Sequence, residues 1–389
     1  MKFGTKVIHS GLETDPATGA IITPIYQTST YVQKKPGDNM GFEYSRTKNP
    51  TRSALEKSLA SIEGGKFGIC YSSGMGAADA IIKLLKPGDT IISNNDIYGG
   101  TYRMFEQVFS NFGLNFLYTD LTRAENLDNV ITNSTKIIWI ETPSNPLLEI
   151  IDIQAISKLV KKKKDLIIVV DNTFASPALQ NPLNLGADIV LHSVTKYIGG
   201  HSDLVMGALI TNNQKLYDEL FLITKSCGAV PGPMDCFLAL RGVKTLEIRM
   251  KKHCENAIKI HEFLSSLKEV NQIYWPGCKS HKNHAIAKKQ MSNFGGMLSF
   301  TLKNDSFTEA VQIISNTKLF KLAESLGGVE SLISHPASMT HASIPKKERE
   351  KNNLSDSLIR ISIGIEDSED LIKDLKQAFQ TNKKGKKRL

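Results

Sequence analysis

The sequence contains no uninterrupted apolar run of about 18 residues, the length that a membrane-spanning helix requires. Its N-terminal segment, MKFGTKVIHSG, also lacks the long apolar core of a secretory signal. These two absences predict a cytoplasmic protein that does not contact membranes.

Cysteine is scarce, and no two of the five cysteines form a CxxC motif. Their odd number and wide spacing argue against a disulfide framework and favour reduced thiols. An HxxH pair, His281 and His284, lies in a loop-like segment with no helical pattern and no third ligand nearby. We therefore expect no metal site.

The sequence also lacks a basic face with interspersed aromatic residues, although its formal net charge is +9. The C-terminal segment KKGKKRL holds five basic residues and no acid, so the rest of the chain carries 9 − 5 = +4. No specific nucleic-acid partner is expected. A non-enzymatic protein that binds polyanions through this tail remains a distant alternative.

Apolar strand-like segments alternate with helical segments between about residues 53 and 245. The strand candidates are FGICYSS, DTIISNN, NFLYTDL, KIIWIETP, DLIIVVDN, ADIVLHS and MGALIT. This alternation predicts an α/β domain with a large, mostly parallel sheet that is covered by helices on both faces.

From about residue 246 the pattern changes to a charged helix, the strands GGMLSFTLKN and LIRISIGIE, and a final helix. This pattern predicts a smaller C-terminal α/β domain with an antiparallel sheet. The first 55 residues show little periodicity and read as an arm that lies on a neighbouring subunit. The predicted divisions are an arm at 1–55, the large domain at 56–245, the small domain at 246–380 and a basic tail at 381–389.

The stretch IVLHSVTKYIGGHSDLVMG, residues 189–207, carries the strongest chemical signal. Lys196 follows a buried strand, where poor hydration lowers the pKa of an amine and makes it a better nucleophile. The hydroxyl groups of Ser193 and Thr195 could bind a phosphate. Asp171 ends an upstream apolar run, LIIVVD. The interpretation is a Schiff base between Lys196 and pyridoxal 5′-phosphate (PLP), with Asp171 at the pyridine nitrogen. An ordinary surface lysine is the alternative.

Other strand ends carry polar or glycine-rich segments. SSGMGA, residues 72–77, leads into a helix whose free N–H groups could bind a phosphate, although tight helix packing would also explain the glycines. Tyr98, in NNDIYGGTYR, could stack on a flat cofactor or transfer a proton; alternatively it is a half-buried core residue.

Arginines in two segments are candidates for binding anions. FEYSRTKNPTR places Tyr44, Arg46 and Arg52 around an Asn-Pro turn. Arg360 lies inside an apolar strand, and a buried arginine requires an anion, either a substrate carboxylate or an internal ion-pair partner.

Several long motifs occur together in one order, namely YSRTKNPTR, SSGMGA, DIYGGTYR, ETPSNP, VVDNTFASP, HSVTKYIGGHSD, AESLGGVESL, HPASMTHASIP and LIRISIGIED. In these motifs the chain resembles the Cys/Met-metabolism PLP-dependent enzymes over about residues 4 to 380. This family includes cystathionine γ-lyase, γ-synthase and β-lyase, and methionine γ-lyase.

The resemblance implies a fold type I PLP enzyme that forms a homotetramer of two catalytic dimers. It implies catalytic roles for Lys196, Asp171 and Tyr98, the last stacking on the cofactor ring. The phosphate would be held by Ser193, Thr195, Gly74 and Met75, and the neighbouring subunit's phosphate by Tyr44 and Arg46. The substrate side would be formed by Asn145, Ser325 and Arg360 at the carboxylate, with Arg103 and Glu324 in the same pocket.

The exact reaction is harder to predict than the family. Members that act on cystathionine typically carry a glutamate where this chain has Glu324, and Glu43 resembles the γ-lyase pattern. Gly100 stands where methionine γ-lyases place a cysteine, and Lys225 stands where relatives often have asparagine. The resemblance favours cystathionine γ-lyase. A γ-synthase that joins an O-acyl-homoserine to cysteine is the first alternative, followed by β-lyase and methionine γ-lyase.

Overall fold

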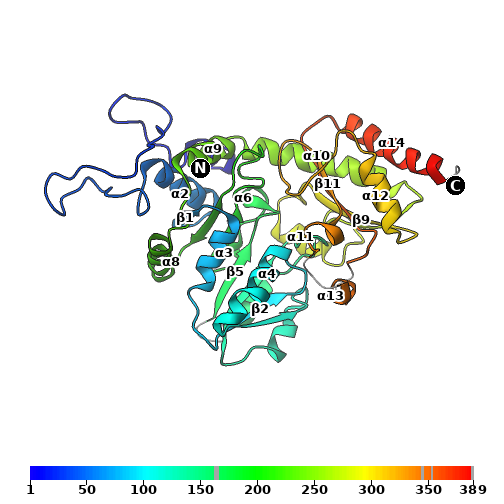
Figure 1. Ribbon diagram of the computed structural model, residues 1–389, viewed down its shortest axis with the longest axis horizontal. Coiled ribbons are helices and arrows are strands. Elements are labelled where there is room, and N and C mark those ends of the chain that lie inside the picture. Colours follow the sequence, from blue (N-terminus) through cyan, green and yellow to red (C-terminus); the bar gives the residue numbers. More distant parts are fainter. Residues whose placement is uncertain (162–165, 343–345, 352–353, 387–389) are drawn as a thin grey trace.

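The computed structural model describes residues 1–386 apart from 162–165, 343–345 and 352–353. The described chain folds around two sheets that follow one another in the sequence (Figure 1). The larger sheet has seven strands in the order β1-β7-β6-β5-β4-β2-β3. Their bounds are β1 Phe67–Tyr71, β2 Thr90–Asn94, β3 Asn115–Thr119, β4 Thr135–Glu141, β5 Ile167–Asp171, β6 Ile189–Ser193 and β7 Gly207–Thr211.

The larger sheet is mostly parallel, as the sequence predicts. Strands β3, β2, β4, β5 and β6 pair in parallel, whereas β7 pairs antiparallel with both β6 and β1. Because β7 lies between β6 and β1, the polar ends of the parallel strands meet beside the turn that connects β1 to the next helix. Ligand sites form at this edge of such sheets.

Helices cover both faces of the larger sheet. The helices of this part of the chain are α1 Phe3–His9, α2 Pro50–Glu63, α3 Gly74–Ile82, α4 Gly99–Gln107, α5 Ile153–Val160, α6 Ser176–Leu179, α7 Pro182–Leu185, α8 Gln214–Cys227 and α9 Pro233–Val243. Two short 3₁₀ helices, η1 Phe109–Phe112 and η2 Ala124–Asn129, complete it.

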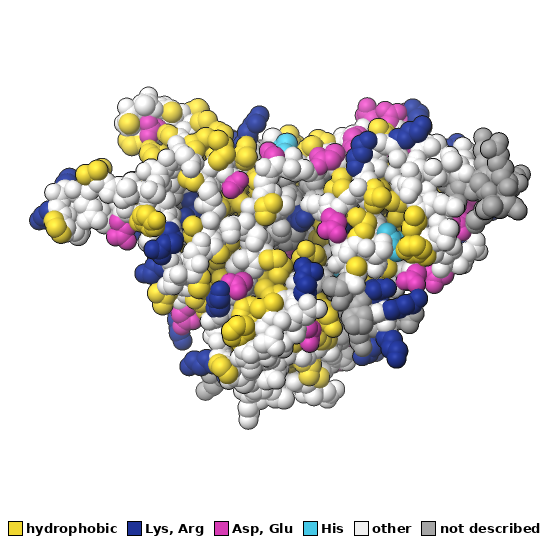
Figure 2. Space-filling model, viewed as in Figure 1, with side chains coloured by type: hydrophobic (Ala, Val, Ile, Leu, Met, Phe, Trp, Pro, Cys, Tyr) yellow, Lys and Arg dark blue, Asp and Glu magenta, His cyan; other side chains and the backbone are white. Residues whose placement is uncertain are grey.

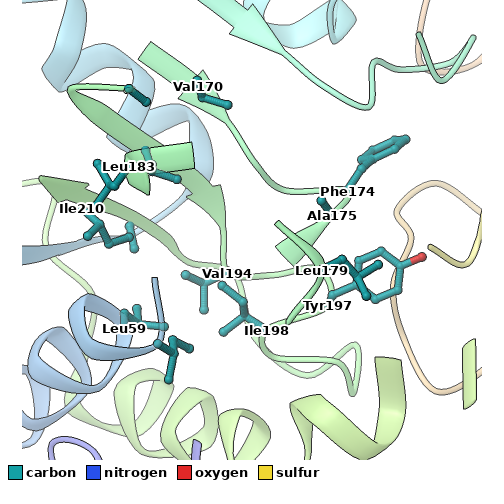
Figure 3. Close-up of a cluster of buried hydrophobic side chains, with 14 of the residues drawn as sticks. Leu59, Val170, Phe174, Ala175, Leu179, Leu183, Val194, Tyr197, Ile198 and Ile210 are labelled. Carbon is teal, nitrogen blue, oxygen red and sulfur yellow. The ribbon is translucent and has the colours of Figure 1, made fainter. Parts of the chain in front are cut away.

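Alternating residues of these strands belong to two separate hydrophobic cores, one on each face of the sheet. Val170 and Val190 pack toward α2, α5 and α9, whereas their neighbours Val169 and Ile189 pack toward α3, α4 and α8. This period of two is the geometry of a strand that is buried on both faces. Figure 3 shows part of the first core, in which Val194 lies beside Leu59 and Ile198.

The smaller sheet has the order β10-β11-β12-β9-β8 and is antiparallel except between β10 and β11. Its strands are β8 Val270–Tyr274, β9 Met297–Leu302, β10 Lys321–Leu322, β11 Leu332–Ser334 and β12 Ile359–Ser362. The remaining helices are α10 Leu246–Ser265, α11 His284–Gln290, α12 Phe307–Ser315, η3 Pro336–Ser338, α13 Lys346–Lys351 and α14 Ser368–Lys386. A third core joins this sheet to α10, α12 and α14.

The two sheets lie on either side of residue 246, but the predicted domain boundaries themselves stay predictions. α14 continues through Lys386 and so includes most of the predicted tail, whose residues 387–389 lie outside the described part of the chain. Over the described residues, no helix combines the length and the apolar composition needed to cross a membrane.

The loops between α1 and α2 project from the body of the molecule (Figure 1). They carry large apolar side chains that are almost fully exposed, including Ile21, Val32 and Met40 at 84%, 94% and 83%. The hydrophobic side chains on this projection are visible in Figure 2. Such an arm buries little surface against its own chain.

Candidate active site

A cavity of about 410 Å³ opens at the carboxyl ends of β4, β5 and β6. It collects side chains from both halves of the chain. The lining residues singled out in the sequence are Gly74, Met75, Tyr98, Asn145, Asp171, Ser193, Thr195, Lys196, Glu324, Ser325 and Arg360. Eleven residues from widely separated motifs therefore meet in one place.

Lys196 lies in the turn directly after β6 and lines the cavity. Its Nζ donates a hydrogen bond of 2.7 Å to Ser325 Oγ. Burial, and then the nearby positive charge of Arg360, lower the pKa of Lys196 to about 8, while Glu324 acts in the opposite direction. The flanking residues Val194 and Tyr197 are fully buried and anchor the turn (Figure 3).

Asp171 is the last residue of β5 and lies one strand away from the Lys196 turn. Its Oδ1 accepts a hydrogen bond of 3.0 Å from the backbone N–H of Thr173. Burial raises the pKa of Asp171, while the bonds from Thr173 and the charge of His192 lower it. A protonated ring nitrogen beside this carboxylate would provide the missing positive partner.

Tyr98 caps the N-terminus of α4, with its side chain 38% exposed. Burial raises the pKa of its phenol, although the positive charge of Arg103 opposes this change. The phenol therefore stays protonated near neutral pH. A neutral, partly exposed ring at the cavity wall is suited to stack on a flat ligand.

The turn into α3 lies beside Ser193, and it leaves little room for a side chain at Gly74 and none at Gly207. Ser73 is the N-cap of α3, and its Oγ accepts a hydrogen bond from Gly76 N–H at 2.9 Å. A Cβ atom on Gly74 would lie 3.0 Å from the Cβ atom of Ser193. A Cβ atom on Gly207 would lie 2.2 Å from the carbonyl oxygen of Ser73. Glycines thus keep a helix N-terminus close to two hydroxyl groups, which is a favourable place for a phosphate.

Arg360 reaches the cavity from β12 of the smaller sheet, and only 2% of it is exposed. Its guanidinium group donates to Asn145 Oδ1 at 2.8 Å and to the carbonyl oxygen of Ser325 at 3.1 Å. Both acceptors are neutral oxygens, so the positive charge remains available to an anionic ligand. Glu324 lines the same cavity and is exposed to it.

Three predicted site residues do not line this cavity. Arg103 is exposed on α4, and Tyr44 and Arg46 lie on the N-terminal arm. Arg46 Nη1 donates to the carbonyl oxygen of Lys225, and its guanidinium group lies 5.4 Å from the centre of the Tyr44 ring. Their roles stay predictions.

Glu141 lines the cavity but was not predicted as a site residue. It is the last residue of β4 and pairs in register with Asp171. Only the strand register places these two carboxyl groups side by side, and no motif in the sequence marks that register. Trp139 and Phe174 were missed in the same way.

A lysine and an aspartate at the ends of adjacent strands, beside a glycine-rich helix N-terminus, define the class of fold type I PLP-dependent enzymes. The comparisons with known proteins identify the family. Residues 4–380 match the family described as Cys/Met metabolism PLP-dependent enzyme, and the chain belongs to this family. PLP is therefore its cofactor.

The relatives carry several activity names. The chain is 51% identical to a cystathionine γ-lyase of Dictyostelium discoideum, over 97% of each chain. It is 50% identical to a cystathionine β-lyase of Coxiella burnetii, over 96% of this chain and 97% of the relative. A crystal structure of cystathionine γ-synthase from Xanthomonas oryzae pv. oryzae, in complex with aminoacrylate and cysteine, superimposes with a TM-score of 0.95 at 42% identity, covering 98% and 99% of the two chains.

Proposed function

We propose that the protein is a cystathionine γ-lyase, which converts cystathionine and water to cysteine, 2-oxobutyrate and ammonia. The observation that carries the proposal is the position of Glu324 in the cavity that holds Lys196 and Arg360. Arg360 would bind the carboxylate beside the reacting carbon, and Glu324 would bind the ammonium group at the far end of cystathionine.

The residues present fit the cofactor. Lys196 would hold PLP covalently through Nζ, Asp171 would pair with the ring nitrogen, and Tyr98 would cover one face of the ring. The phosphate would lie against Ser193 and Thr195 and the N-terminus of α3, where Gly74 and Met75 supply free N–H groups. When bound, PLP supplies an electron sink that accepts the electron pair left on the substrate after loss of a proton.

The side chains then move protons. After the substrate amine has replaced it, the neutral Lys196 amine takes the proton from the substrate Cα, because its lowered pKa leaves much of it unprotonated near pH 8. That proton then passes from Lys196 to the bound cofactor, after which Lys196 or Tyr98 takes a proton from Cβ and the sulfur leaves from Cγ. Because burial raises the pKa of the Tyr98 phenol, we favour Lys196 as this base and Tyr98 as an acid.

Two other reactions are supported by named relatives at similar identity. In a β-lyase the carbon–sulfur bond breaks at Cβ and the keto acid is pyruvate. In a γ-synthase, cysteine attacks the intermediate formed when an O-acyl-homoserine loses its acyloxy group. The first has a relative at 50% identity and the second a solved structure at 42% identity. Gly100, in place of a cysteine, makes methionine γ-lyase the weakest of the four readings.

The deciding experiment is a substrate panel with the purified holoenzyme. Cystathionine should yield 2-oxobutyrate as the main keto acid, measured by chromatography. Pyruvate as the main product would replace the proposal with β-cleavage. Faster formation of cystathionine from an O-acyl-homoserine and cysteine would replace it with synthesis. The synthesis is assayed with both O-acetyl-homoserine and O-succinyl-homoserine.

We further propose that the protein acts as a homotetramer of two catalytic dimers. The support is the exposed apolar arm, which also carries Tyr44 and Arg46 away from this chain's own cavity. In a dimer the arm would place both side chains at the phosphate of the neighbouring subunit.

A further inference from the structure

The carboxyl group of Glu141 connects the end of β4 to the loop that follows β2. Its Oε2 accepts a hydrogen bond of 2.9 Å from the backbone N–H of Tyr98, which follows β2. Asn145 lies four residues further along the chain, in the loop that follows β4. The Glu141 N–H is in turn fixed by Asn94 Oδ1 at 2.9 Å. The side chain is 4% exposed and lines the cavity.

Both loops carry residues that line the cavity. Tyr98 supplies the ring at the cavity wall, and Asn145 Oδ1 accepts the 2.8 Å hydrogen bond from Arg360. His341 Nε2 lies 3.0 Å from the carbonyl oxygen of Asn145 and holds the same residue from the other side. Glu141 therefore holds the Tyr98 loop to the end of β4, from which the Asn145 loop departs.

The environments of Glu141 and Asp171 also indicate which of the two carboxyl groups carries a proton. Burial, and then the charge of Asp171, raise the pKa of Glu141 well above its ordinary value, although the backbone N–H of Tyr98 acts in the opposite direction. Asp171 retains two compensating interactions, from Thr173 and His192. Glu141 therefore holds the proton of the pair, and the negative charge stays on Asp171, where the ring nitrogen requires it.

We propose that Glu141 is a positioning residue, which sets the Tyr98 ring at the cavity wall by accepting the backbone N–H of Tyr98 and so holding that loop to the end of β4. The proposal rests on the proposed site role of Tyr98. It does not depend on which sulfur compound is cleaved. In this role Glu141 acts through Tyr98 and not on the substrate itself.

Two conservative variants separate the effect of side-chain length at position 141 from the effect of its charge. Glu141→Gln keeps the length and an uncharged acceptor, so its PLP dissociation constant and KM should stay within about threefold of wild type. Glu141→Asp keeps the carboxyl group but is one methylene shorter, so it should leave a buried N–H unsatisfied and raise both constants about tenfold or more. PLP affinity is measured by absorbance titration of the apoprotein, and KM with whichever substrate the wild type turns over.

A matched control separates positioning from loss of stability. Asp374 is a buried carboxylate that does not line the cavity and that accepts backbone N–H groups from Lys318, Leu319 and Phe320. Asp374→Leu should lower the melting temperature while PLP affinity and KM stay near wild type. Glu141→Leu should raise both constants at least tenfold in protein that remains folded.

Two results would overturn the proposal. One is Glu141→Asp with constants within threefold of wild type. The other is Glu141→Gln that loses PLP affinity while Glu141→Asp keeps it, because charge and not reach would then be the requirement. If Glu141→Leu does not fold, the Gln and Asp pair decides the question. Failure of γ-cleavage in the wild type would reject the proposed reaction and leave this comparison intact.

Discussion

Lys196 lies in an environment that favours the neutral, nucleophilic amine, and this amine has a defined hydrogen-bond partner. The Ser325 hydroxyl group orients its amine, while burial and Arg360 lower its pKa to about 8. Its ordinary pKa would leave almost no neutral amine near neutral pH. The structure therefore provides a reactive amine without a separate base.

A pH dependence follows from this lowered pKa. Only the neutral amine attacks the PLP aldehyde, so the rate of PLP capture by the apoprotein should rise with pH, level off above about 8, and not continue toward 10.5. Stopped-flow absorbance measures this rate. Lys196→Ala is the control, and it should form no visible chromophore and have no turnover. A rate that is flat between pH 6 and 9 would contradict the lowered pKa.

Arg360 gives a second prediction at the scale of single residues. Arg360→Ala removes the buried cation at the carboxylate side of the cavity and should raise KM by an equivalent of about 2–5 kcal/mol. PLP absorbance should remain, because Arg360 lies on the substrate side. Steady-state kinetics measure the effect, and an unchanged KM would show that Arg360 does not bind the substrate carboxylate.

The sequence was informative about residues whose role depends on local chemistry. Lys196 and Asp171 each follow an apolar run, and Arg360 interrupts one, so their unusual environments could be predicted. Glu141 could not be assigned a role, because its neighbours Asp171 and Tyr98 come from other parts of the chain. Its importance depends on strand register and hydrogen-bond partners, which only three-dimensional structure defines.

Among the elements, the junction of β7 with the α3 turn is the most closely packed part of the site. The absence of a side chain on Gly207 lets the carbonyl oxygen of Ser73 approach the strand. Gly207→Ala should displace the α3 N-terminus and weaken PLP binding about tenfold or more. Equilibrium titration of the apoprotein measures this effect. Gly232→Ala is the matched control, because its new Cβ atom would lie at an ordinary 3.5 Å from Asp235 and should have little effect.

All seven strands of the larger sheet were predicted, because each is a short apolar run with polar ends. The antiparallel direction of β7 was not, since direction depends on the path of the chain between β6 and β7. In the smaller sheet β8, β10 and β11 were missed: β10 and β11 are very short, and β8 is exposed in its middle.

At the scale of the whole molecule, the arm predicts that active sites are shared between subunits. Arg46→Ala and Lys196→Ala should each be inactive, since one loses the phosphate contact and the other the amine. Refolding the two together should restore about a quarter of wild-type activity, because half of the dimers would pair the variants and each would have one intact site. Lack of any recovery in mixed dimers, verified by differently tagged subunits, would reject the sharing of sites.

The hydrogen bond between Asn145 and Arg360 has a mechanical consequence. Asn145 follows a strand of the larger sheet and Arg360 belongs to the smaller one, so this contact spans the seam between the two lobes. A substrate carboxylate held by both side chains would fasten the lobes at the place where catalysis occurs. The two parts already share a hydrophobic core, so occupancy would add one further contact across the seam, and the added rigidity would be present only while the substrate is bound.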